Sequence, residues 1–233
     1  MLGSRTSVVL AALFLLCFTV TAAFAADIVT VPTANQLKAG EIDLAAYHIE
    51  LDNFGPVDCV RAQTIYAGLN DKIELDVHRY DVDLPAEAGP GVATIFNATY
   101  LVVTEGAEKP NVVLGVRDMT SEYGHASYFV AAAKTLNPPV GGPPTGPIYR
   151  VHLGLGTEDN TLLNEPRHDG IFGGLQVCVK PSFPMVGAIA LYDGQDIITG
   201  LTYTHSPTWP TIKGGTFGDH TWIGISYTFN CKQ

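Results

Sequence analysis

Apolar and polar residues alternate with a period of two along most of the chain after residue 39. Between residues 72 and 78, for example, the aliphatic residues Ile73 and Leu75 are interleaved with the charged residues Glu74 and Asp76. Successive side chains of a β-strand point to opposite faces, so this alternation puts the aliphatic residues on one face and the charged residues on the other. The pattern predicts a series of strands with one apolar face each.

Eleven segments fit this pattern, and the breaks between them are rich in Gly, Pro, Asn and Asp. They are residues 40–52, 58–69, 72–83, 93–104, 110–118, 125–135, 147–157, 170–180, 185–192, 195–205 and 221–230. Single-chain bacterial barrels have an even number of strands, so eleven indicates one strand too few or too many. Residues 27–33 or part of 206–219 could supply a twelfth, and ten or twelve strands both stay open.

Composition narrows the class of protein. Of 233 residues, 46% are hydrophobic and 15% are charged, with 24 Gly and 15 Pro. Low charge, high apolar content and frequent chain breakers exclude disorder, a coiled coil and a helical bundle. The net charge of −10 argues against a nucleic-acid partner, because phosphate binding needs a surplus of Lys and Arg.

The first 25 residues predict a cleaved export signal. Arg5 provides the positive start, residues 8–20 form an apolar stretch, and Ala23 and Ala25 form an A-x-A cleavage site. Thirteen apolar residues in a helix rise about 20 Å, which is too short for a bilayer core of about 30 Å. A lipoprotein signal ending at Cys17 is the alternative. We expect residues 26–233 to form one domain, exported to the envelope of a double-membrane bacterium.

The predicted domain is an all-β, single antiparallel up-and-down transmembrane β-barrel of about 10–12 strands. Several of the predicted strands are 10 to 12 residues long, whereas soluble strands average about 5–6 residues and a tilted membrane strand needs about 9–11. Aromatic residues gather near strand ends, as in the girdles of outer-membrane barrels. These are Tyr47, Tyr66, Tyr80, Tyr100, Tyr128, Tyr149, Tyr192, Tyr203, Trp222 and Tyr227.

Charged residues and histidines in mid-strand lie opposite aliphatic residues, which predicts that they line a polar lumen. The predicted lumen-facing charge network is Glu74, Asp76, His78, Arg117, Arg150, His152 and Lys180. Buried charges need partners, so we expect the carboxylates of this set to pair with Arg117, Arg150 or Lys180 across the barrel. Small barrels fill with side chains, so bulk porin activity is not expected.

Several phrases of the sequence, in this order, resemble the YjbH-like family of outer-membrane β-barrels. They are VPTANQLKAGEIDLAAYH (31–48), GLNDKIELDV (68–77), PNVVLGVRDM (110–119), SYFVAAAKTL (127–136), RVHLGLGT (150–157), GIFGGLQV (170–177) and ALYDGQDIITGLTY (190–203). The family is linked to exopolysaccharide production. The resemblance implies an envelope structural or exopolysaccharide-export accessory role, with outer-membrane lipid and either polysaccharide or envelope export proteins as partners.

Two other classes of function stay open. A secreted soluble β-sandwich that binds glycans would show the same alternation with its apolar faces turned inward. A barrel enzyme acting on lipid A or phospholipid could use His125 as a base and Ser127 as a nucleophile. We expect no enzyme, no catalytic residue, no cofactor and no metal. Cys59, Cys178 and Cys231 allow one disulfide at most, with its pairing open.

Overall fold

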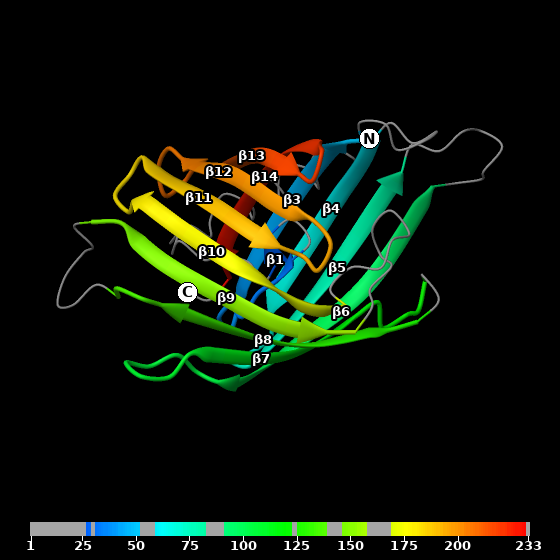
Figure 1. Cartoon of the computed structure of the whole chain (residues 1–233), viewed down its shortest axis with the longest axis horizontal. Coiled ribbons are helices and arrows are strands. Elements are labelled where there is room, and N and C mark those ends of the chain that lie inside the picture. The colour runs from blue at the N-terminus through cyan, green and yellow to red at the C-terminus, as the bar shows by residue number, and fades with distance from the viewer. Residues whose placement is uncertain are drawn as a thin grey trace, which may run out of the picture.

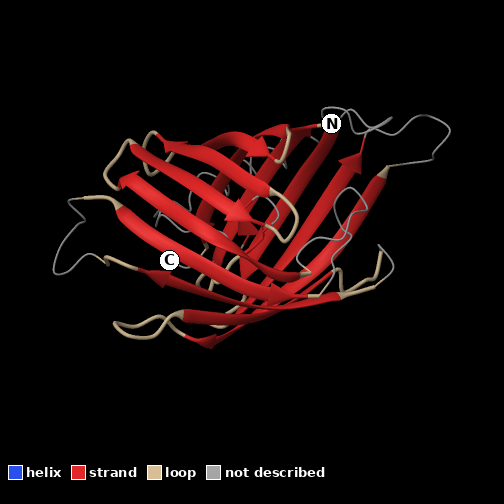
Figure 2. Cartoon of the chain, in the orientation of Figure 1, coloured by secondary structure: helices blue, strands red, loops and turns tan. Residues whose placement is uncertain are grey.

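The computed structural model describes residues 27–28, 31–51, 59–82, 91–122, 125–138, 146–157 and 169–231. The predicted signal peptide (residues 1–25) lies outside them. Figure 2 shows this part of the chain as strands joined by loops and turns. Within the described ranges, no helix is long and apolar enough to cross a membrane.

Twelve strands, β3 to β14, close into one barrel. Each pairs in antiparallel fashion with the next strand in the sequence, and β14 pairs with β3 to close the ring. The strands are β3 (Glu41–Glu50), β4 (Cys59–Gly68), β5 (Ile73–Val82), β6 (Val92–Val103), β7 (Asn111–Arg117), β8 (Ser127–Thr135), β9 (Ile148–Gly156), β10 (Gly170–Lys180), β11 (Met185–Tyr192), β12 (Ile197–Thr204), β13 (Thr211–Phe217) and β14 (His220–Asn230).

This topology confirms the prediction of an all-β, antiparallel up-and-down barrel and sets the number of strands at twelve. The sandwich alternative is wrong as an architecture, because one sheet closes on itself and no second sheet packs against it in the described part of the chain. The strand missing from the predicted eleven is β13, which lies in the segment 206–219. The described residues of the segment 27–33 do not join the wall. They contribute β1 (Asp27–Ile28) and β2 (Val31–Pro32), which pair only with each other.

The strands run alternately between two rims. We call the rim at which β3 begins and β14 ends the terminal rim, and the other the opposite rim. Because consecutive strands alternate in direction, the turns after β4, β6, β8, β10 and β12 lie at the terminal rim. At this rim, the backbone N–H of Gly40 donates to Gly68 and the N–H of Cys231 donates to Gly40, so both ends of the barrel sequence are tied to the wall.

Burial alternates along the strands and separates an inward face from an outward face. On β5 the inward residues, such as Asp76 and His78, are buried, whereas Leu75 and Arg79 face outward and are exposed. The proposed aromatic girdle was partly wrong. Four of its members lie on the inward face and are buried there: Tyr47, Tyr66, Tyr80 and Trp222.

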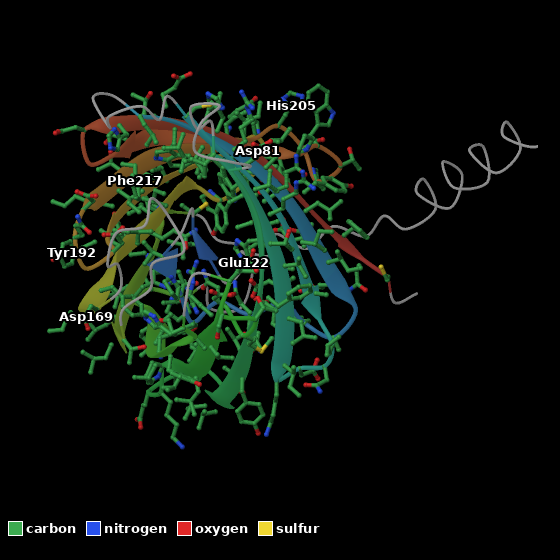
Figure 3. The ribbon with its side chains drawn as sticks, turned by 90° about the vertical axis from the view of Figure 1, so that its right-hand side faces the viewer. Asp81, Glu122, Asp169, Tyr192, His205 and Phe217 are labelled. Atoms are coloured by element: carbon green, nitrogen blue, oxygen red, sulfur yellow. The ribbon has the colours of Figure 1, made fainter. Side chains whose placement is uncertain are left out.

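Residues 31–37, which we call the lumen segment, run inside the barrel. Val31, Ala34 and Leu37 are almost completely buried. The segment contacts inward residues of β5, β7 and β9, and β2 lies beside β10. Contacts with so many strands require a position inside the ring. Figure 1 places β1 within the barrel, and Figure 3 shows the dark-blue N-terminal strands inside the ring.

Large aromatic side chains fill another part of the lumen by packing over inward glycines of neighbouring strands. A Cβ atom added to Gly154 would lie 2.2 Å from the ring of Phe172, and one added to Gly115 would lie 2.0 Å from the ring of Phe129. The two rings meet edge to face at 6.3 Å. Only glycine leaves room for such a ring directly against the backbone, so the lumen between β7 and β10 is filled by this pairing.

Candidate functional site

The barrel interior is the candidate functional site, because it collects the charged residues that the sequence singled out. Six of the seven predicted residues lie on inward strand positions. Arg150 is half-buried there, and the other five are buried: Glu74, Asp76, His78, Arg117 and His152.

Lys180 does not belong to this set. It is exposed at the last position of β10, beyond a register shift between Cys178 and Lys180. The shift interrupts the alternation of faces, which is why a strict period of two misplaced this side chain.

Asp76 and His78 form the centre of a buried hydrogen-bond chain. His78 Nε2 lies 2.6 Å from Asp76 Oδ1, and the Asn97 side-chain amide donates to the same oxygen at 2.5 Å. The other ring nitrogen, His78 Nδ1, lies 3.2 Å from the hydroxyl oxygen of Thr64 and 3.3 Å from that of Tyr80. The chain links β4, β5 and β6 across the inward face.

The order hydroxyl, imidazole and carboxylate is that of an acyl-transfer triad. Here Thr64, His78 and Asp76 are only 3%, 1% and 4% exposed. In this conformation all three side chains are almost completely shielded from solvent. What the arrangement does is satisfy buried polar groups and tie three adjacent strands together.

Arg150 on β9 is the centre of a second cluster. Its Nε donates to Asn35 Oδ1 of the lumen segment at 2.6 Å, and its Nη1 donates to Glu105 Oε2 at 2.5 Å and to the Thr135 hydroxyl at 2.8 Å. Glu105 lies in the turn after β6, at the terminal rim, and its other carboxylate oxygen accepts the backbone N–H of Thr135. One guanidinium therefore joins the turn, the wall and the lumen segment.

The pKa of Glu105 reflects this contact. Partial burial alone would raise it, but the hydrogen bond from Arg150, the backbone N–H of Thr135 and the positive charge of Arg150 outweigh burial and lower it below its usual value.

Glu74 holds the lumen segment at its other end. Its Oε2 accepts the backbone N–H of Leu37 at 2.7 Å. One residue further along, the N–H of Lys38 donates to Glu41 Oε2 at 2.8 Å. The sequence predicted Arg117, Arg150 or Lys180 as the partner of Glu74. Of these three, Arg150 binds Glu105 instead.

Sequence reasoning missed the partners of these charges. Asn35, Glu105 and Asn97 were not assigned to the predicted charge network, although each makes a short hydrogen bond to one of its residues. Asn35 and Glu105 lie outside the predicted strands, so no alternation marked them. Their place depends on where the lumen segment and the turn after β6 fold.

The other candidate chemistry finds little geometric support. Ser127 is buried, and its hydroxyl donates to the carbonyl oxygen of Thr157 at 2.9 Å, while His125 is exposed. Cys59, Cys178 and Cys231 form no disulfide. Among the described residues, no group of three or more His, Cys, Asp or Glu side chains is placed to hold a metal ion.

Comparison with known proteins leaves the family open. No family model matches the chain, and a search of curated proteins finds no match. The resemblance to the YjbH-like family therefore stays a prediction from the quoted phrases.

Proposed function

We propose that this protein is an outer-membrane β-barrel with a filled polar lumen. The observation that carries the proposal is the inverted distribution of side chains. Leu153, Ile171 and Leu201 point outward and are 60%, 61% and 66% exposed, while carboxylates and an arginine are buried inside. Water-soluble proteins rarely expose so large a continuous apolar surface, whereas a lipid-facing barrel requires it.

The longer strands of the wall are long enough to cross the apolar core of a membrane. Strands of nine to twelve residues such as β6, β8 and β9 are about 30–40 Å long at about 3.3 Å per residue. Tilted by about 40°, they project about 23–30 Å along the barrel axis, close to the apolar band of about 25 Å in known membrane barrels.

Outward aromatic residues lie near the limits of this band. Tyr100, Tyr149 and Tyr203 lie toward the terminal rim, and Tyr128 and Tyr192 lie toward the opposite rim, where Figure 3 shows Tyr192 projecting away from the barrel. Such residues favour the interface between headgroups and hydrocarbon.

Strands β3 to β5 interrupt the apolar surface toward the opposite rim. The outward positions of this sector carry Arg61, Gln63, Arg79 and Asp81, and His48 pairs with Glu50 at 2.9 Å. Charged residues in hydrocarbon are costly. In the proposed orientation, this part of the wall stands above the hydrocarbon, in the headgroup layer or in water.

The biological role that we propose is an envelope structural or exopolysaccharide-export accessory function. The filled lumen supports this role over bulk diffusion, because the lumen segment and the aromatic rings occupy the space that a porin leaves open. The link to exopolysaccharide rests on the sequence resemblance alone. The proposed partners are outer-membrane lipid and either polysaccharide or envelope export proteins.

Membrane insertion is tested with two substitutions to arginine on the outward face. Leu153→Arg places a charge in the middle of the apolar band, at a cost of about 2–4 kcal/mol near the bilayer midplane. Gln63→Arg is the matched control, because it adds the same side chain to the polar sector of β4. We expect wild type and Gln63→Arg in the outer-membrane fraction, with a band on SDS gels that moves on heating, and less folded protein for Leu153→Arg.

The proposal fails if the wild-type protein is soluble without detergent and its band does not move on heating. Equal membrane insertion of both variants would contradict the assigned lipid-facing surface. The polysaccharide role is tested separately, by measuring secreted polysaccharide in cells with and without the protein. Unchanged secretion would remove that role and leave the membrane barrel standing.

A further inference from the structure

We propose that the lumen segment, residues 31–37, closes a cation-preferring passage through the barrel, and that displacing the segment opens it. This inference rests on the proposed membrane location. It adds an activity, ion permeation, that we expect only when the segment is displaced.

The size of the barrel requires something inside it. With strands about 4.8 Å apart and tilted by about 40°, twelve strands give a backbone radius of about 12 Å, against about 8 Å for eight strands. Eight-stranded barrels are just filled by their own inward side chains. The backbone radius of a twelve-stranded barrel is about 4 Å larger, so its inward side chains alone leave the centre unfilled. That space is wide enough for an extended chain.

The lumen segment occupies this additional space. Val31 and Ala34 have no exposed surface, and Leu37 is 1% exposed. The segment is held at a few polar points close to the terminal rim: Leu37 N–H to Glu74, the Ala34 carbonyl to the Asn111 amide, and the Asn35 side chain to Arg150. It forms no ladder with the wall, since its short strand β2 pairs only with β1. The wall can therefore keep all of its ladders when the segment leaves.

Gly68 has no side chain, and this leaves room for the backbone at the end of the lumen segment. A Cβ atom at this position would lie 2.1 Å from the carbonyl oxygen of Lys38 and 2.9 Å from that of Leu37. Both clashing atoms belong to backbone, so no side-chain rotation relieves the overlap. A side chain at residue 68 has to push residues 37 and 38 away from the wall.

The emptied lumen would present mainly carboxylates beside the path of the segment. Glu41 and Asp43 on β3, and Glu74 and Asp76 on β5, are buried inward residues of the half of the wall near the terminal rim. Two of these four, Glu41 and Glu74, bind backbone N–H groups of residues 37 and 38 and would lose those donors. Among inward cations, Arg150 is already bound to Glu105. Arg117 ends β7 toward the opposite rim, and Lys213, which lies over the Tyr47 ring, stands near Asp43 alone of the four carboxylates. Rings of acidic side chains favour cations over anions.

The test compares two glycine substitutions in planar lipid bilayers. Gly68→Val is predicted to displace the lumen segment. Gly106→Val is the matched control, because a Cβ atom at Gly106, in the turn after β6 at the same rim, meets nothing within 4 Å. A second opened variant lacks residues 27–37 and keeps the export signal, so the result does not depend on one substitution.

We expect step-like currents from Gly68→Val and from the deletion variant, and none from wild type or Gly106→Val. In a potassium chloride gradient, the reversal potential of the opened variants should shift toward the potassium equilibrium potential, and Glu74→Gln added to Gly68→Val should reduce that shift.

The inference is overturned if opened variants that insert and keep heat-modifiable mobility stay silent. It is also overturned if their currents prefer chloride or if wild type conducts equally. Failure of every variant, wild type included, to insert would instead reject the membrane location, and this inference with it.

Discussion

Replacing Gly154 by alanine should destabilise the barrel through a specific collision inside the lumen. The added methyl group would lie 2.2 Å from Cε2 and 2.3 Å from Cζ of Phe172. Carbon atoms pack at about 3.5–4.0 Å, so the ring has to move by more than about 1 Å. Phe172 is 1% exposed and meets Phe129 edge to face, so it has little room to move.

The sign of the effect follows from two opposing contributions. Overpacking of a close-packed core costs about 1–3 kcal/mol. Alanine in place of glycine recovers about 0.4–1 kcal/mol, because it restricts the unfolded chain. We therefore expect Gly154→Ala to lower the free energy of unfolding by about 1–2 kcal/mol. Gly106→Ala, which has open space around the new methyl group, should leave stability unchanged or slightly raised.

The assay is urea-induced unfolding of the protein in detergent or lipid, followed by tryptophan fluorescence, since Trp222 is buried in the lumen. Adding Phe172→Leu to Gly154→Ala should relieve the collision, so the double variant should be more stable than the two single effects predict when added. Equal stability of the Gly154 and Gly106 variants, or strict additivity of the two substitutions in the lumen, would refute the packing argument.

Two further effects follow from the buried contacts. The pKa of Glu105 in the folded protein is lower than its unfolded-state pKa of 4.5. The ionised carboxylate therefore contributes its full stability above pH 4.5, and this contribution is lost as the pH falls through the folded-state pKa. Wild type should accordingly lose more stability than Glu105→Gln between about pH 5 and pH 3, and parallel stability curves would contradict the Arg150 contact. Asp76→Ala removes the partner of His78 at 2.6 Å and of Asn97 at 2.5 Å. The midpoint of its unfolding in urea should fall by an amount that corresponds to a loss of about 1–3 kcal/mol in the free energy of unfolding. An unchanged midpoint would show that the network does not stabilise the fold.

The alternation of apolar and polar residues predicted most strands of the wall, and it failed where the alternation is weak. Residues 72–78 alternate clearly, and β5 forms where expected. β13 was missed because its sequence TIKGGTF has two glycines and a lysine in seven residues and shows no regular alternation. This strand is specified by its neighbours β12 and β14, which pair with it along its whole length.

Alternation also has an inherent ambiguity, since it divides residues into two faces without saying which face is inside. Lys213, Tyr47 and Trp222 show the consequence. The sequence marked both aromatic residues as girdle candidates, but in the closed barrel they are buried, and the Lys213 ammonium lies over the Tyr47 ring, 5.7 Å from its centroid.

Sequence by itself determined the strand-rich architecture, the approximate strand positions and the set of charged residues that share a face, because a period of two is a property of neighbouring residues. Tertiary structure alone decided that Asn35 and Glu105 meet Arg150, and that residues 31–37 run through the lumen. Those contacts join residues up to 115 positions apart. They exist only because twelve strands close into a ring too wide for its own side chains to fill, so a segment of the chain lies inside it.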